Sequence, residues 1–159
     1  MRQLRLGIYL LAFVLLLSGC GGGGQQSVQE EADAKTVAGY VVEQVPFDDD
    51  IEAIDDALVL TIYGISQQDV TSYSLYASSG ATASEVAVFV CTDADAAKRV
   101  QQAAEERVQR QLESFETYIP AELPKLQDPL LVQSGNTVAL CVSGHNDEAS
   151  EALKHFGIE

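Results

Sequence analysis

The stretch SEVAVFVCTDADAAKRVQQAAEERVQRQLESFETYI, residues 84–119, contains two different hydrophobic periodicities. Residues 84–92 are rich in β-branched and aromatic side chains, which is typical of a strand. Because side chains alternate between the two faces of a strand, the valines at 86, 88 and 90 share one face, and Ala87, Phe89 and Cys91 share the other. From Thr92 onward the apolar residues recur at a helical spacing. The stretch therefore predicts a strand that leads directly into a helix.

This predicted helix is long and amphipathic. Thr92 and Asp95 have the spacing of a capping box at its start, and Pro120 cannot continue it. Charges of both signs lie on one face between Lys98 and Arg110, including Arg107, which is typical of a solvated surface. The apolar residues that repeat every three or four positions on the other face are Ala97, Val100, Ala104, Val108, Leu112, Phe115 and Ile119.

Two hairpins flank the long helix in the sequence. VTSYSLYAS, residues 70–78, precedes the strand at 84–92 across a loop that contains Gly80, which predicts a first hairpin. LLVQSGNTVALCVSG, residues 130–144, predicts a second hairpin that turns at 134–136. Two hairpins joined by a long helix predict an α+β domain with a single four-stranded, mainly antiparallel sheet.

Three further helices are expected outside the hairpins. Residues 33–45 place valines at helical spacing and stop before Pro46, which predicts a first leading helix. The acidic residues at 48–50 resemble an N-terminal cap for a second, short leading helix that Gly64 ends. A short C-terminal helix is expected over residues 147–157.

The N-terminus has the features of a bacterial lipoprotein signal. After Arg2 and Arg5, an apolar run of about a dozen residues has the length of a signal-peptide core, whereas a membrane span needs roughly 20. The run ends in Leu17-Ser18-Gly19-Cys20, which looks like a lipobox, whose cysteine accepts a diacylglyceryl group. We therefore expect a signal peptide at 1–19 and a lipid on Cys20, which anchors the protein to the extracytoplasmic side of the cell membrane.

The segment after Cys20 is expected to link this anchor to the domain. Residues 21–31 are rich in glycine and glutamine and contain one bulky apolar residue, Val28. Such a composition cannot bury enough surface to fold and predicts a flexible tether over residues 20–31. The remaining residues, 32–159, are enough for one globular α+β domain with its own core.

The charge of the chain narrows the classes of partner. The formal net charge is −15, and removing Arg2 and Arg5 with the signal peptide leaves −17. Such a surface repels the phosphate backbone, so a nucleic-acid partner is not expected. A basic protein surface or a small cationic ligand fits this charge better. The membrane is expected as a partner through the lipid on Cys20.

Three stretches resemble a known family. They are LTIYGISQQDVTSYSLYASSGATASEVAVFVCTD at 60–93, ESFETYIPAEL at 113–123 and NTVALCVS at 136–143. Their order behind a lipobox resembles small lipoproteins of Gram-positive, clostridia-like bacteria that are described as a domain of unknown function. The resemblance implies lipoprotein status and the same order of elements, but it implies no activity. The positions that carry it are Tyr63-Gly64-Ile65, Ser79-Gly80-Ala81 with Glu85, and Ser114-Phe115 with Tyr118.

Besides Cys20, the chain has Cys91 and Cys141, both on predicted strands. Matching the apolar residues at 138, 140 and 142 with the valines at 86, 88 and 90 puts the two cysteines on the same side of the sheet. If their strands are neighbours, a disulfide can form in an oxidising compartment. The alternative, two buried thiols that do not pair, stays open.

No motif in the chain indicates a catalytic, metal or cofactor site. His145 and His155 lack the spacing of zinc ligands, and the acidic residues at 48–50 lack the EF-hand pattern. The serine-rich loop at 78–84 contains no nucleophile elbow. We therefore expect a non-catalytic binding or interaction module. The alternative is a cell-envelope hydrolase that uses acidic residues.

Overall fold

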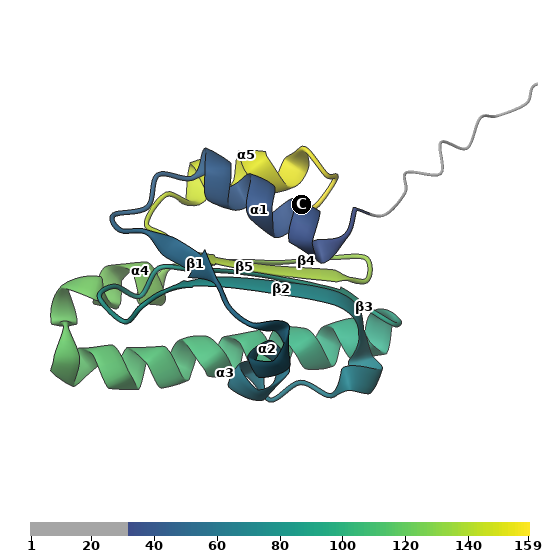
Figure 1. Cartoon of the computed structure of the whole chain (residues 1–159), viewed down its shortest axis with the longest axis horizontal. Coiled ribbons are helices and arrows are strands. Elements are labelled where there is room, and N and C mark those ends of the chain that lie inside the picture. The colour runs from purple at the N-terminus through teal and green to yellow at the C-terminus, as the bar shows by residue number, and fades with distance from the viewer. Residues whose placement is uncertain (1–31) are drawn as a thin grey trace, which may run out of the picture.

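A computed structural model describes residues 32–159 and shows a sheet between two layers of helices (Figure 1). The helices α1 and α5 cover one face of the sheet, and α2, α3 and α4 lie on the other side. The helices are α1 (Ala34–Gln44), α2 (Asp56–Tyr63), α3 (Ala94–Tyr118), α4 (Leu123–Gln127) and α5 (Asn146–Lys154), and short 3-10 turns are η1 (Gln67–Asp69) and η2 (Pro120–Glu122). The strands are β1 (Ile51–Ala53), β2 (Val70–Ser78), β3 (Glu85–Cys91), β4 (Leu130–Ser134) and β5 (Thr137–Val142).

The α+β class and the two hairpins are confirmed, but the predicted number of strands is wrong. The sheet of the described residues has five antiparallel strands in the order β1-β2-β3-β5-β4. The extra strand, β1, pairs with the end of β2 and lies where the second leading helix was expected to begin. That helix, α2, starts later because the side chain of Asp55 caps it, accepting from the Ala57 N–H at 2.9 Å. Gly64 ends it at φ 73°, as predicted.

The long helix is confirmed as α3, with a correction at its first residue. Asp93, and not Thr92, is the N-cap: its carboxylate accepts from the backbone N–H groups of Asp95 and Ala96. Thr92 is not available for this role because its hydroxyl donates to the Gln68 carbonyl in η1 at 3.3 Å. In residues 32–159, no helix combines the length and the apolar character that crossing a membrane requires.

The two faces of the sheet have separate cores, and the prediction that the two cysteines share a face is wrong. The register of β3 and β5 pairs Val86 with Cys141, so Cys141 faces α1 and α5 with the valines. Cys91 faces the other way, in the core beneath α3. Its backbone N–H donates to the carbonyl of Asn136, just before β5 begins. Five positions of a strand, roughly 17 Å, therefore separate the cysteines along the sheet, which is too far for a disulfide.

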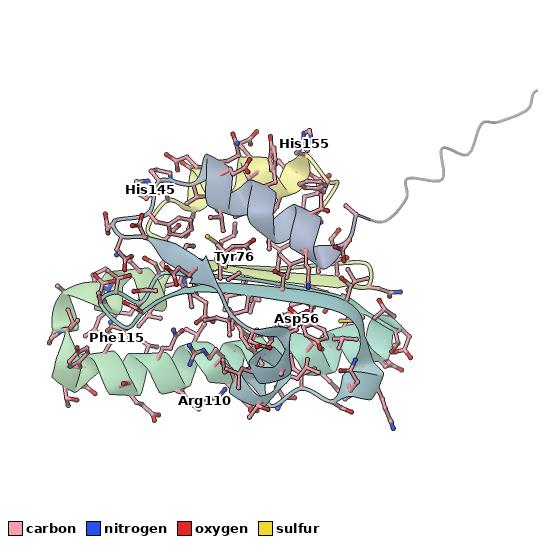
Figure 2. The ribbon with its side chains drawn as sticks, in the orientation of Figure 1. Asp56, Tyr76, Arg110, Phe115, His145 and His155 are labelled. Atoms are coloured by element: carbon pink, nitrogen blue, oxygen red, sulfur yellow. The ribbon has the colours of Figure 1, made fainter. Side chains whose placement is uncertain are left out.

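The histidines belong to the layer of α1 and α5 (Figure 2). His155 stacks on Tyr40 of α1 with ring centroids 4.7 Å apart, and its ring also meets Phe156 edge to face. His145 stands at the start of α5, 3.7 Å from the Glu148 carboxylate. Both lie across the sheet from Arg110 and Phe115, which are on α3.

Candidate functional site

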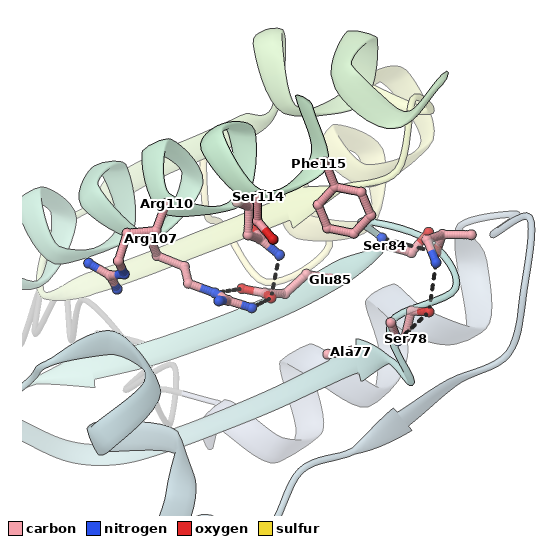
Figure 3. A pocket seen from close by; sticks show the side chains of 11 residues that line it. Ala77, Ser78, Ser84, Glu85, Arg107, Arg110, Ser114 and Phe115 are labelled. Carbon is pink, nitrogen blue, oxygen red and sulfur yellow. Dashed lines mark hydrogen bonds and ion pairs between the residues drawn. The ribbon is translucent and has the colours of Figure 1, made fainter. Parts of the chain in front are cut away.

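Glu85 is a buried carboxylate at the start of β3. Its odd-numbered position turns it toward α3, together with Ala87 and Phe89, and its exposed fraction is 0%. Residues 107 and 111 of α3 lie one helical turn apart, so both of their side chains reach this carboxylate. Figure 3 shows the side chain of Arg107 extending from α3 to Glu85. Glu85 is thus held between the sheet and the helix.

Four hydrogen bonds saturate the Glu85 carboxylate. Oε1 accepts from the Tyr63 hydroxyl at 2.5 Å and from Arg107 Nε at 3.3 Å. Oε2 accepts from Arg107 Nη2 at 2.6 Å and from Gln111 Nε2 at 3.1 Å. The guanidinium therefore contacts both oxygens, which is the strong, geometrically specific form of a carboxylate–arginine pair. Tyr63 and Gln111 supply the remaining donors that a buried charge requires.

Burial and charge shift the pKa values of two of these partners. Burial, followed by the negative charge of Glu85, raises the pKa of Tyr63 well above its usual value, so the phenol stays protonated and donates. Burial works against the charge of Arg107, but the hydrogen bond and charge of Glu85 outweigh it, and its pKa is raised. The phenol of Tyr63 therefore stays neutral and the guanidinium of Arg107 stays charged across the neutral pH range.

A cavity of about 170 Å³ opens beside this cluster, between the β2–β3 loop and α3. Its floor is formed by the Glu85–Arg107 pair, and both walls contribute polar groups (Figure 3). This volume is large enough for a small organic molecule or several waters. The other residues that define its walls include Gly80, Thr82, Ser84, Arg110, Gln111 and Phe115.

Two residues of the cavity lining each contain a buried polar atom that lacks a hydrogen-bond partner among the described residues. These atoms are the hydroxyl oxygen of Ser84 and the amide oxygen Oε1 of Gln111. Ser84 is 2% exposed and Gln111 is 7% exposed, so neither residue is open to bulk solvent. A buried polar atom without a partner costs about 1–3 kcal/mol. Both residues are among those that line the same cavity.

The β2–β3 loop is fixed in place from two sides. Asp49 accepts from the hydroxyls of Ser78 and Thr82, at 2.6 and 2.7 Å. On the other side, Glu122 accepts from the backbone N–H of Ala83 at 2.9 Å. Lys125 is 2.9 Å from Glu122 and 2.6 Å from Asp48, and so joins the two supports. The cavity wall is therefore held in its shape before any ligand binds.

These contacts show what the acidic run at 48–50 does. Asp49 holds the loop, and the pKa of Asp48 is lowered by its hydrogen bond to Lys125 and then by the charge of that lysine. In the part of the chain that the structure describes, no group of three or more His, Cys, Asp or Glu side chains is arranged to hold a metal ion. The run thus belongs to the support of the cavity.

The cysteines do not contribute to the cavity. Cys20 lies outside the described residues, as do the predicted signal peptide and tether. Cys141 is buried under α1 and α5, and burial raises the pKa of its thiol to about 11 although a hydrogen bond to Ser143 acts in the opposite direction. Cys91 is buried in the core on the α3 side.

Sequence reasoning missed most of the cavity residues. The sequence pattern places Arg107 and Arg110 on a solvated face, and it indicates no binding role for Gln111 or Ser84. One signal was present: Glu85 is the single acid in a strand that is otherwise apolar, and a buried acid needs a cationic partner. Two of the stretches used for the resemblance meet here, since residues 60–93 contribute Tyr63, Gly80 and Glu85, and residues 113–123 contribute Phe115.

The fold and the cavity define an α+β domain with a polar site at one end of its sheet. The chain belongs to the family described as a domain of unknown function (DUF4358), whose model matches residues 43–143. That range contains all five strands, α2 to α4 and every residue that lines the cavity, whereas α5 and nearly all of α1 lie outside it. No curated protein and no solved structure matches the chain.

Proposed function

We propose that this protein is a lipid-anchored, extracytoplasmic binding module that takes a small polar molecule into the cavity beside Glu85. The observation that carries the proposal is the pair of buried, unpartnered atoms on Ser84 and Gln111, which line one preformed cavity. Native proteins satisfy nearly all buried polar groups, and the described residues leave three such atoms without a partner. Two of the three belong to residues of this one cavity, whereas the third, Asn146 Oδ1, belongs to the first residue of α5. A polar ligand supplies the missing partners.

The geometry supports binding better than hydrolysis. Among the described residues, Glu85 is the one carboxylate that lines the cavity, and its two oxygens already accept four hydrogen bonds. Glycoside hydrolysis needs two carboxylates with free access to the substrate. Two further acids contact the loop at the cavity wall, Asp49 and Glu122, and both hold it in place. The envelope-hydrolase alternative therefore gains no support from this site.

The position of the cavity agrees with a tether at the N-terminus. The described chain enters beside the start of β2, where the N–H of Ala34 donates to Ser72 at 3.1 Å. The cavity lies past the other end of β2, at Ser78 and the loop that follows. Six positions of a strand span roughly 20 Å. The cavity is therefore separated by this distance from the point where the proposed tether joins the domain.

A thermal-shift screen tests the binding role. The full chain is solubilised in detergent and heated with amino acids, hydroxy acids, sugars, polyamines, short peptides and cell-wall fragments. A ligand that prefers the folded state raises the melting temperature in a saturable way. We expect at least one class to do so. If none does, or if a cell-wall fragment is cleaved during the screen, the binding role is wrong.

Ser84→Ala is the sharpest variant for this screen. It removes an unpartnered hydroxyl without breaking any contact that the structure shows. We expect the free variant to be as stable as the wild type or more stable, and to lose the ligand-induced shift. Ser150→Ala, on α5 at the other side of the sheet, is the matched control and should keep the shift. If Ser84→Ala retains the full shift, the ligand binds elsewhere.

A separate experiment tests the anchor. We expect the wild-type protein to partition into the detergent phase of a Triton X-114 extraction, and its N-terminal peptide to carry a diacylglyceryl mass on Cys20. Cys20→Ala should move the protein to the aqueous phase or leave its signal peptide uncleaved. An unmodified Cys20 in the mature wild-type protein contradicts the anchor and leaves the cavity proposal intact.

A further inference from the structure

The charge of the cavity is opposite to the charge of the chain. The ionisable groups that line it are the carboxylate of Glu85 and the guanidinium groups of Arg107 and Arg110. The whole chain, in contrast, has a formal net charge of −15. Because Glu85 and Arg107 pair with each other, they neutralise one another. One positive charge remains, on Arg110.

Arg110 is positioned but not neutralised. Its Nη2 donates to the Ile62 carbonyl at 3.1 Å, which fixes the side chain between α3 and the end of α2. In residues 32–159, no carboxylate lies within salt-bridge distance of its guanidinium. A guanidinium has five N–H donors, and a single bond to a carbonyl leaves most of them available to an anion.

We propose that the ligand of this cavity is a small carboxylate that also carries an O–H or N–H donor, such as an α-hydroxy or α-amino acid. Arg110 binds its carboxylate, Gln111 Oε1 accepts from its donor, and the Ser84 hydroxyl completes the hydrogen bonds. This inference rests on the binding function proposed above and specifies its ligand class. Each of the three groups is one that the structure leaves with unused capacity.

The size and charge of the site favour a carboxylate over other anions. A cavity of about 170 Å³ suits a molecule of the size of a small organic acid. A carboxylate brings one negative charge, which matches the single unneutralised guanidinium. A phosphate brings about −1.5 to −2, and the excess would face Glu85 in the same cavity. Gln111 Oε1 can only accept, so an anion without a donor leaves it unsatisfied.

Calorimetric titration of the full chain in detergent tests the ligand class. The probes are lactate, glycerate, glycine and serine, each compared with its primary amide, which keeps the shape and removes the charge. Each acid is also compared with a counterpart that lacks the donor, such as propionate for lactate. We expect at least one acid to bind at least about tenfold more tightly than both of its counterparts, because charge-assisted hydrogen bonds are the strong ones.

Arg110→Gln tests the residue assignment. We expect it to bring the affinity of the preferred acid down to that of its amide, while the amide affinity stays nearly unchanged. Arg99→Gln, on the same helix and paired with Asp69 outside the cavity, is the control and should keep the preference. A preference that survives Arg110→Gln overturns the assignment of the carboxylate to this residue.

The outcomes separate this inference from the function on which it rests. If the amides bind as well as the acids, and Ser84→Ala abolishes that binding, the cavity is a binding site but the anionic class is wrong. If none of the acids binds, the inference is also wrong, and a hit from another class in the thermal-shift screen would still uphold the binding function. If neither experiment finds a ligand, both are wrong.

Discussion

The two faces of the sheet solve the problem of burial in different ways. The face under α1 and α5 is filled by apolar residues. The polar groups buried there are a few neutral hydroxyls, such as that of Ser74. The face under α2, α3 and α4 has an apolar core of similar kind, but it also buries Glu85 with Arg107. In the described residues, Glu85 is the one charged side chain that is fully buried.

This difference between the two faces indicates that the functional site lies on the face that buries Glu85. A buried ion pair is weak evidence for stability, because a well-packed apolar replacement is often as stable or more stable. The pair therefore needs another reason to be present, and the cavity beside it supplies one. The family match agrees with this division, since it includes the helices of the polar face and leaves out α5 and nearly all of α1.

The largest effect is expected from breaking the buried pair. Arg107→Met leaves the Glu85 charge without its counterion and should lower the free energy of unfolding by about 3–5 kcal/mol, measured by urea denaturation. Arg99→Met removes a guanidinium from an exposed pair with Asp69 and should change stability little. If the two variants lose the same small amount, Glu85 does not depend on Arg107 for its burial.

A truncation on the apolar face should be nearly as costly and should leave the cavity intact. Leu153→Ala removes a side chain of α5 that is 1% exposed, and we expect a loss of about 3 kcal/mol from the free energy of unfolding. The ligand-induced thermal shift should stay unchanged, because the cavity lies across the sheet. If this variant loses ligand binding while folded, the two faces are coupled, and the comparison fails.

The loss of stability at alkaline pH should depend on a buried thiol of the apolar face, that of Cys141. Burial raises the pKa of Cys141 from 9.0 to about 11 in the folded state. The folded state then holds a proton that the unfolded state has lost, so about 2–3 kcal/mol of stability is present below pH 9 and disappears as the pH rises to 11. Cys141→Ala should show a flatter decline in urea denaturation over this interval.

The Cys141→Ala comparison separates the thiol from other effects. The cavity that the substitution leaves costs stability equally at every pH, and Tyr63 titrates in both proteins. Only the difference between the two pH profiles belongs to the thiol. Parallel profiles for the wild type and the variant would contradict the burial of Cys141 as a protonated thiol.

The smallest of these effects is expected at Tyr63. Tyr63→Phe removes one of the four hydrogen bonds to Glu85 and keeps the packed ring, so the free energy of unfolding should fall by about 1–2 kcal/mol. Tyr73→Phe removes an exposed hydroxyl and should have no comparable effect. A larger loss for Tyr63→Phe than for Arg107→Met would show that the phenol, and not the guanidinium, holds the carboxylate.

The sequence predicts the parts of this fold that follow a local period. The apolar repeat of α3 and the alternation in β3 specify those elements, and Gly64 correctly marks the end of α2. The strand β1 could not be recognised because it has three residues and follows an acidic run that resembles a helix cap.

The faces of the cysteines and the residues of the cavity both depend on information that no local pattern contains. The faces of Cys91 and Cys141 follow from the register of β3 with β5, and these strands are separated in the sequence by α3 and β4. The role of Arg107 follows from the rotation of α3 against the sheet. On the sequence alone, this residue cannot be told from the exposed charges around it.

A high-resolution crystal structure of the protein purified from its native membrane tests the central claim most directly. We predict a small organic molecule in the cavity, with one atom within hydrogen-bond distance of Ser84 Oγ and another within that distance of Gln111 Oε1. We also expect its carboxylate to lie against Arg110. If ordered waters alone satisfy Ser84 and Gln111, the cavity is a hydrated feature of the fold, and its role as a binding site is contradicted.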